Sequence, residues 1–298
     1  MKKILVVGDI IIDNYVYGSV DRLAPDFLGM VFDEIAQDTY LGGAGLVAQT
    51  LANIAPEEVE ITLEGSLPPM YEKLLNPRIK LNRVSEEAMI KTRYVASGQG
   101  RPDKPWGSQK IIRVDNIKKF KQSTKVEDSA RDGYDYVVIS DYNKGTVPIG
   151  FKVASTNPMV IADTKSNTLT KYNRVDLLKI NQSEYQTLQT EIANVKHTVI
   201  TYGRKPVEVK NFGYKAYTVP TYELSIHDRV EYDPCGAGDS FLAGLIVGLV
   251  YTDNNLHKSI KYANIVASLK VFSFGTEAIS KVKFERELNN AQVSSDVV

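Results

Sequence analysis

Cysteine and histidine are scarce in this 298-residue chain. The single cysteine, Cys235, excludes an internal disulfide framework and is typical of a protein from a reducing compartment. The three histidines, His197, His227 and His257, lack the spacing of metal ligands, and we interpret them as structural or surface residues. No histidine stands at a fixed spacing from Cys235, so this residue is better interpreted as a small turn residue than as a nucleophile.

Excess charge and long apolar runs are also absent. Lys and Arg number 36 and Asp and Glu number 36, so the composition indicates no broad attraction to nucleic acid or to an anionic membrane. The N-terminal apolar run stops at Gly8, which is too short for the core of a signal peptide. The apolar segment from Phe241 to Val250 is about half of the ~20 residues that a membrane helix needs. The sequence therefore predicts a cytoplasmic protein with no nucleic-acid or membrane partner, and a local basic pocket remains possible.

The chain does contain a glycine-rich turn joined to an apolar helix. Gly236 and Gly238 allow a tight turn, and Ala237 between them adds little bulk, so successive N–H groups can point into one concavity. The positive end of the following helix lies at this turn, which favours a phosphate there. Asp239 then stands beside an anion site, either as a base for a hydroxyl group or as a cap that accepts helix N–H groups. This stretch alone leaves both roles open.

The N-terminal region offers a second set of polar residues. Asp9 follows a strand that we expect to be buried, and Asp13 lies four residues further on. Ligands of open parallel sheets bind at the carboxyl ends of the strands, so both side chains can meet a polar substrate; an Asp turn followed by a surface residue is the alternative. Gly42 and Gly43 begin a helix, where a close approach to a ligand and a plain tight turn both remain open.

Strand signals become regular from residue 136 onward. The apolar strands expected there cover 136–140, 160–162, 177–180 and 198–201. Helical or loop segments separate them, which predicts a parallel sheet. Polar or glycine residues mark their ends: Asp141, Asp163, Asn181 and Gly203. Short strands within about 14–38 and 88–115 predict a small lid inserted in a single α/β domain that covers residues 1–298.

Taken together, these motifs resemble a known family. Asp233–Phe241, D-P-C-G-A-G-D-S-F, is similar to the D-T-x-G-A-G-D-x-F signature of the ribokinase-like, phosphofructokinase-B-type carbohydrate kinases. Leu41–Ala44 resembles the N-terminal glycine signature of that family, and Asn181–Glu184 resembles its N-x-x-E motif. The resemblance covers nearly the whole chain and is closest to the D-glycero-β-D-manno-heptose-7-phosphate kinases. The motifs that resemble this subgroup are Val7–Asp9, Lys91–Arg93, Ile112–Asp115, Ser140–Tyr142 and Phe274–Thr276.

The resemblance implies a ribokinase-like three-layer α/β/α body with a mainly parallel central sheet and a small β-sheet lid. It also implies transfer of the γ-phosphoryl group of ATP to a sugar hydroxyl, with Asp239 as the base. The N–H groups of Gly236, Ala237 and Gly238 would hold charge on the phosphoryl oxygens. Mg²⁺ would be held by Asn181 and Glu184 through water. The residues assigned to the nucleotide are Asn181, Glu184, Gly203, Gly238, Asn264 and Gly275.

A sugar site is implied in the same way. The substrate-binding residues assigned to it are Asp9, Asp13, Gly42, Gly43, Lys91, Arg93, Asp141 and Lys144. The first two aspartates would bind hydroxyl groups, with the glycines close to the sugar ring. The basic side chains would hold a phosphate already present on the substrate, and solvated lid charges are the alternative.

Departures from the family pattern leave the substrate and the ion dependence open. Leu46 stands where the family usually has an asparagine, so a hydrogen bond to the sugar is missing or is supplied elsewhere. Pro234 and Cys235 replace the usual hydroxyl-bearing residues, which puts a monovalent-cation site in doubt. The segment from about Ile61 to Leu81 looks shortened, and Gly98–Trp106 looks inserted.

Heptose 7-phosphate, phosphorylated at O1, is the substrate that the resemblance favours, and a hexose, a hexose phosphate or a nucleoside is the alternative acceptor. The bifunctional members of that subgroup carry a C-terminal nucleotidyltransferase domain, and we expect none in this chain. A non-catalytic nucleotide or sugar sensor with the kinase fold is the alternative of another class. Open strand edges in the expected lid favour a homodimer formed through it.

Overall fold

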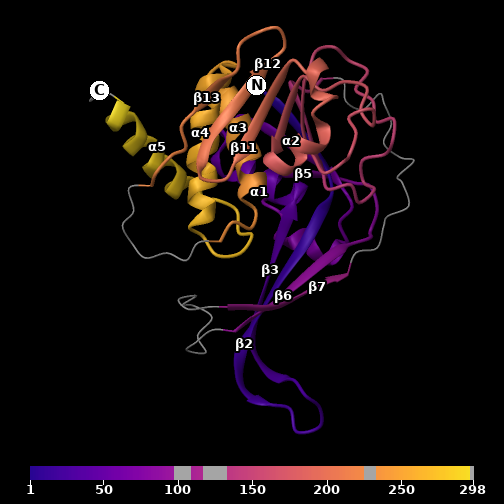
Figure 1. Cartoon of the computed structure of the whole chain (residues 1–298). Coiled ribbons are helices and arrows are strands. Elements are labelled where there is room, and N and C mark those ends of the chain that lie inside the picture. The colour runs from indigo at the N-terminus through magenta and orange to yellow at the C-terminus, as the bar shows by residue number, and fades with distance from the viewer. Residues whose placement is uncertain (97–108, 117–132, 225–232, 296–298) are drawn as a thin grey trace.

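The computed structural model describes residues 1–96, 109–116, 133–224 and 233–295. His227 and the Gly98–Trp106 segment that looked inserted lie outside the described residues. Within the described ranges, a nine-stranded sheet forms the centre of the molecule and a four-stranded sheet stands beside it (Figure 1).

The large sheet is mainly parallel. Its strands, in spatial order, are β13 (Tyr217–Val219), β12 (Lys205–Asn211), β11 (His197–Tyr202), β10 (Leu177–Asn181), β9 (Met159–Thr164), β8 (Tyr136–Asp141), β1 (Lys3–Gly8), β4 (Glu60–Gly65) and β5 (Ile79–Arg83). Neighbours from β11 to β5 are parallel, and the pairs β11–β12 and β12–β13 are antiparallel. The α/β fold class with a mainly parallel sheet and a second, smaller sheet is thus confirmed.

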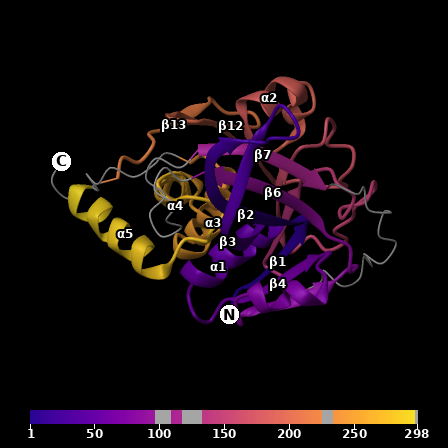
Figure 2. The same ribbon diagram turned by 90° about the horizontal axis from the view of Figure 1, so that it is seen from below.

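The two faces of the large sheet bury different halves of each strand. In β1, Ile4 and Val6 join the apolar cluster formed with the helices, whereas Leu5 and Val7 join the cluster on the opposite face. The helices of the first face are α1 (Ala44–Ile54), α3 (Ala237–Tyr251), α4 (Leu256–Val271) and α5 (Lys281–Ser295) (Figure 2). On the other face lie loop residues and α2 (Gln182–Leu188), which is followed by the 3-10 turn η3 (Ile192–Asn194).

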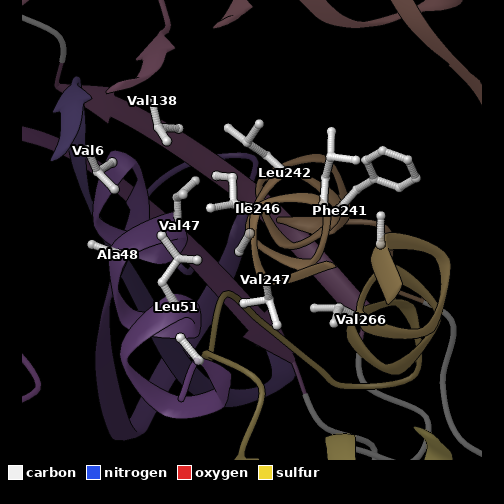
Figure 3. Packing of buried hydrophobic residues seen from close by; sticks show 14 of the residues in the cluster. Val6, Val47, Ala48, Leu51, Val138, Phe241, Leu242, Ile246, Val247 and Val266 are labelled. Atoms are coloured by element: carbon white, nitrogen blue, oxygen red, sulfur yellow. The ribbon is translucent and has the colours of Figure 1, made fainter. Parts of the chain in front are cut away.

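Figure 3 shows how α1 and α3 meet beneath the sheet. Val47 and Leu51 of α1 lie beside Ile246 and Val247 of α3, and Val6 of β1 lies above them. All these side chains are fully buried, so the apolar surface removed from water holds α3 against α1 and the central strands.

Glycines let α3 and α4 pack closely. A Cβ atom built on Gly244 would lie 2.9 Å from the Cα of Ala263, and one built on Gly248 would lie 2.5 Å from the Cα of Ser259. Any larger residue would push the two helices apart. This close contact holds α4 directly against the helix that begins at the glycine turn.

The small sheet consists of β3 (Met30–Gly43), β2 (Ile10–Leu23), β6 (Met89–Ala96) and β7 (Gln109–Asn116), in that spatial order. The pair β2–β6 is parallel, and the two outer pairs are antiparallel. The hairpin of β2 and β3 extends away from the body of the molecule (Figure 1). These strands lie in the two segments from which the sequence predicts a lid.

The Ile61–Leu81 segment is more regular than its sequence indicates. It holds most of β4, the 3-10 turn η1 (Pro69–Leu74) and the first part of β5. Both strands pair in parallel with their neighbours, which extends the large sheet beyond β1.

Candidate active site

The glycine turn begins α3 as the sequence predicts. Gly236 precedes the helix with φ 78°, in the left-handed region that glycine adopts without strain. A Cβ atom on Gly236 would lie 2.6 Å from Cδ2 of Leu46 and 3.3 Å from Cε of Lys270. A Cβ atom on Gly238 would lie 3.1 Å from Nζ of Lys179. The turn is therefore enclosed by one apolar and two basic side chains.

Asp239 is buried in the first turn of α3. The hydroxyl group of Tyr142 donates to both of its carboxylate oxygens, at 2.8 Å and 2.9 Å. Burial and, next, the nearby charge of Asp163 raise the pKa of Asp239 to about 6, against the opposing effects of Tyr142, Lys179 and Lys165. A carboxylate with this pKa is ionised at pH 7 yet close enough to neutrality to exchange protons.

Two lysines bring positive charge to the same place. Lys179 donates to Asp163 at 2.6 Å, and both side chains are buried. Lys165 pairs with Glu184 and lies 4.0 Å from Asp163. Burial disfavours the charge of Lys165, but these two carboxylates outweigh burial and raise its pKa. The ammonium group of Lys165 also lies 5.7 Å from the centre of the Tyr142 ring.

The N-x-x-E motif forms a capping box. The side chain of Asn181 caps α2 by accepting from the N–H groups of Ser183 and Glu184, and Glu184 accepts from the N–H group of Asn181 at 2.8 Å. The side-chain amide of Asn181 donates to Glu184 at 2.7 Å as well. The two residues assigned to Mg²⁺ thus hold each other at the end of β10.

Asp9 and Asp141 hold the loop that follows β8. The carboxylate of Asp9 accepts from the backbone N–H groups of Lys144 and Thr146, both at 3.1 Å. Burial raises the pKa of Asp9, and the charge of Asp141 adds to the shift. Asp141 accepts from Lys171 at 2.6 Å and from the hydroxyl group of Tyr172 at 2.5 Å. Both aspartates are engaged within the chain, so their assignment to the substrate stays a prediction.

Asp13 forms a buried ion pair with Arg93, which joins β2 to β6. Nη2 of Arg93 lies 3.4 Å from Sγ of Cys235 and donates to it, and the guanidinium group stacks on the ring of Tyr15 at 5.2 Å. The small sheet therefore contacts the residue just before the glycine turn. Cys235 also accepts from the hydroxyl group of Tyr15 at 3.6 Å, so both side chains of the small sheet hold it in place.

The paired glycines lie where the two sheets meet. A Cβ atom on Gly42 would lie 2.2 Å from Oδ2 of Asp13. Gly43 has φ 59°, and a Cβ atom there would lie 2.4 Å from the carbonyl oxygen of Asp9 and 3.4 Å from the ring of Tyr142. The packing of the chain itself therefore requires glycine at both positions. Close approach to a ligand, the other role considered for them, stays a prediction.

A second contact joins the small sheet to the glycine turn. Nζ of Lys110, on β7, lies 2.8 Å from the carboxylate of Asp233 and 5.3 Å from the centre of the Phe274 ring. Phe274 in turn packs edge-on against Tyr15 of β2, with ring centres 5.7 Å apart. The small sheet thus rests on both loops that flank α3 and α4.

The remaining residues assigned to the nucleotide lie apart from one another in the chain. Gly203 stands at the β11–β12 turn with φ 68°, and a Cβ atom built there meets no other atom within 4 Å. Asn264 is buried on α4 and donates to the carbonyl oxygen of Pro220 at 2.6 Å. The N–H group of Gly275 donates to Asp233 at 3.0 Å. Of the three, Gly203 is the one with open space beside it.

Three lysines of the site were not found from the sequence. Lys165 follows the strand-end residue Asp163, Lys179 interrupts the apolar run of β10, and Lys270 lies on the buried face of α4, seven residues after Ala263. A charged residue within an apolar pattern is the signal that could have revealed the last two.

Within the described ranges, no set of three or more His, Cys, Asp or Glu side chains is arranged to hold a metal ion. No helix in those ranges is both long enough and apolar enough to span a membrane.

Known proteins are similar to this chain in sequence. Residues 155–282 match the pfkB family carbohydrate kinase profile. "Bifunctional protein HldE" of Pelobacter propionicus is 24% identical over 329 aligned positions, which cover 98% of this chain and 64% of that protein. The chain thus spans less than two thirds of the length of this curated relative.

Solved structures share the fold. A nucleoside kinase of Burkholderia thailandensis aligns with a TM-score of 0.68 at 16% identity, over 96% of this chain and 99% of that one. A ribokinase of Cryptococcus neoformans in complex with ADP aligns with a TM-score of 0.63 at 12% identity, over 96% of this chain and 98% of that one.

The fold of this chain is therefore the one shared by these ribokinase-like structures, with a buried carboxylate beside its glycine turn. The sequence similarity to the pfkB family of carbohydrate kinases lies in residues 155–282, less than half of the chain.

Proposed function

We propose that this protein transfers the γ-phosphoryl group of ATP to a hydroxyl group of a sugar or sugar phosphate, with heptose 7-phosphate and its O1 hydroxyl as the first pair to test. The observation that carries the proposal is Asp239, a buried carboxylate with a raised pKa at the start of α3. The resemblance of Lys91–Arg93 and Ser140–Tyr142 to the heptose-7-phosphate kinases supports the choice of acceptor.

Asp239 is the general base of the proposed reaction. Above pH 6 its carboxylate is ionised and accepts the proton of the acceptor hydroxyl. Tyr142 donates to both carboxylate oxygens and so fixes the direction of the group without taking its proton. The N–H groups of Gly236 and Gly238 lie at the start of α3, where the helix dipole stabilises negative charge on the transferred phosphoryl oxygens. The N–H group of Ala237, assigned to the same oxygens from the sequence, already donates to the carbonyl oxygen of Pro234 at 3.2 Å.

Lys91 and Lys144 are the residues that we propose for a phosphate carried by the substrate. Both are partly exposed, and Lys91 lies 5.6 Å from the centre of the Tyr142 ring, close to the proposed base. Arg93, assigned to the same phosphate from the sequence, is buried and paired with Asp13. Its charge is already neutralised, so we propose that it holds the small sheet in place.

The residues assigned to Mg²⁺ fit an ion bound through water. Asn181 and Glu184 offer oxygen atoms, the donors that Mg²⁺ prefers, but these oxygens already accept hydrogen bonds within the capping box and from Lys165. Direct ligation would break the box, whereas water molecules can bridge to oxygens that keep their bonds. When bound with ATP, the ion would neutralise charge on the phosphate groups.

Glu184→Gln separates the capping role from the proposed metal role. An amide oxygen still accepts from the N–H group of Asn181, whereas the ion pair with Lys165 is lost, so the thermal midpoint should fall less than it does in Glu184→Ala. Loss of the negative charge should raise the Mg²⁺ concentration that gives half-maximal rate by about 10-fold or more. Glu184→Ala, which loses both roles, is the control and should also be less stable. An unchanged Mg²⁺ titration for Glu184→Gln would remove Glu184 from the metal site.

A coupled assay of ATP consumption over a panel of sugars, sugar phosphates and nucleosides tests the proposed function. Fastest turnover with heptose 7-phosphate supports the acceptor proposed here, and fastest turnover with a hexose, a hexose phosphate or a nucleoside keeps the reaction but replaces the acceptor. Ligand binding by calorimetry with no phosphoryl transfer to any acceptor would identify a sensor and end the kinase proposal.

We also propose a cytoplasmic homodimer joined through the small sheet, which would act as a lid. Its outer strands, β3 and β7, are edge strands, and large apolar side chains on it are exposed, including Ile35, Ile112 and Val114. Sedimentation at micromolar concentration should show a dimer. The double variant Ile112→Lys, Val114→Lys should sediment as a monomer, because two buried charges on the same face oppose association. A monomeric wild type would contradict the proposal.

A further inference from the structure

Lys270 is a fully buried lysine on α4, close to the proposed site. Its ammonium group donates to the backbone carbonyl oxygen of Ser273 at 3.2 Å and to that of Gly275. Burial lowers the pKa of Lys270 to about 8, so the group remains protonated at pH 7. Burying an ammonium group is costly unless polar partners replace water, and here backbone carbonyl groups are those partners.

The ammonium group lies beneath the glycine turn. Cε of Lys270 is 3.3 Å from the position of a Cβ atom on Gly236, the residue that begins α3. The carboxylate of Asp233 accepts from the N–H group of Gly275 at 3.0 Å and from that of Cys235 at 3.1 Å. Lys270 and Asp233 thus fasten the loop after α4 to the turn before α3.

Other charged and polar groups surround this contact. Asp233, Cys235 and Glu277 favour the charge of Lys270, and Lys110 opposes it. The hydroxyl group of Thr276 is buried without a hydrogen-bond partner among the described residues, and its methyl group lies 3.6 Å from the Cβ position of Gly236. Two backbone carbonyl oxygens of the loop therefore bind the ammonium group directly, and the carboxylate of Asp233 lies close enough to favour its charge.

Oxygen atoms of this kind also bind potassium ions, because backbone carbonyl groups can replace the hydration shell of the ion. We propose that Lys270 is a built-in substitute for a bound monovalent cation: phosphoryl transfer at the glycine turn needs no potassium ion, and removal of the ammonium group creates a potassium site. The fixed charge beneath Gly236 also favours negative charge on a phosphoryl group held at the turn. Lys270 is a positioning residue in this role, since it acts through the turn and the loop.

Thermal unfolding in potassium, ammonium or tetramethylammonium chloride at equal ionic strength tests the site without any substrate. Lys270→Ala should unfold at a lower temperature in tetramethylammonium chloride and regain stability in potassium or ammonium chloride. The wild type should give the same midpoint in all three salts, as should Lys261→Ala, a control that removes an exposed lysine from the same helix. Lys270→Met fills the space with an apolar side chain, so its unfolding midpoint should not rise in potassium or ammonium chloride.

The kinetic part of the test rests on the proposed function, whereas the unfolding part does not. For an acceptor that the wild type phosphorylates, kcat of Lys270→Ala without potassium should fall by about 10- to 100-fold, the effect of one unit charge at the dielectric constant of a protein surface, and potassium should restore it. Equal midpoints of Lys270→Ala in all three salts would overturn the inference. If Lys270→Ala fails to fold in every salt, the wild type alone decides. Activation or stabilisation of the wild type by potassium, relative to tetramethylammonium, would overturn the inference. Equal activity and equal stability of the wild type in the two salts would support it.

Discussion

Asp239→Asn should lower kcat/KM for phosphoryl transfer by about 10²- to 10⁴-fold, because an amide cannot accept the proton of the acceptor hydroxyl. The side chain keeps its volume, and its amide oxygen can still accept from the hydroxyl group of Tyr142, so the fold and the binding of ATP should persist. Turnover measured with the best acceptor of the panel, together with calorimetric ATP binding, checks this expectation.

Asp253→Asn serves as the control, since it removes the same charge from an exposed turn with φ 48°, a conformation that asparagine adopts readily. Its turnover should equal that of the wild type. In the wild type, kcat/KM should fall as the pH drops below about 6, because the carboxylate of Asp239 becomes protonated there. Tyr142→Phe removes a hydrogen bond that lowers this pKa, so the acid limb should move to higher pH. Full activity of Asp239→Asn would exclude it as the base.

A sequence pattern predicts a helix or strand correctly when the same surroundings, such as one buried face, extend along the whole element. Helix α4 is such an element, because one buried face repeats along its length from Leu256 to Val271. The strands β1, β8, β9, β10 and β11 lie where continuous apolar runs predict strands buried on both faces. Local sequence is enough in these cases.

Strands β4 and β5 show where such reasoning stops. In β4, Thr62 and Glu64 alternate with apolar residues, and Glu64 is buried because Asn82 on β5 donates to it at 2.8 Å. That partner is 18 residues away in the chain, so no local pattern reveals that a carboxylate can be buried there. Two tandem prolines between the strands further hide the regular structure.

The candidate site shows the same limit. The glycine turn and Asp239 are adjacent in sequence, so their juxtaposition can be predicted from the motif. Lys179, Lys270 and Tyr142 reach the turn from other elements, and only the fold brings them together. The N-x-x-E motif has a further ambiguity, because one pair of side chains both forms a capping box and offers oxygen atoms to an ion.

Arg93→Met should lower the free energy of unfolding by about 3–5 kcal/mol, because it leaves the carboxylate of Asp13 buried without its partner. The guanidinium group also loses its contacts with Tyr15 and Cys235, so the small sheet should be held less firmly against the glycine turn. Urea unfolding followed by circular dichroism measures the loss.

The double variant Asp13→Asn, Arg93→Met removes both charges and should regain most of that stability, since no unpaired charge remains buried. Lys91→Met is the matched control on the same strand: it lies in a partly exposed position, so its stability should change little while KM for a phosphorylated acceptor rises. If Arg93 instead bound the phosphate of the substrate, Arg93→Met would unfold like the wild type and raise KM alone. The comparison of the two single variants therefore decides which basic residue of β6 supports the fold and which contacts the substrate.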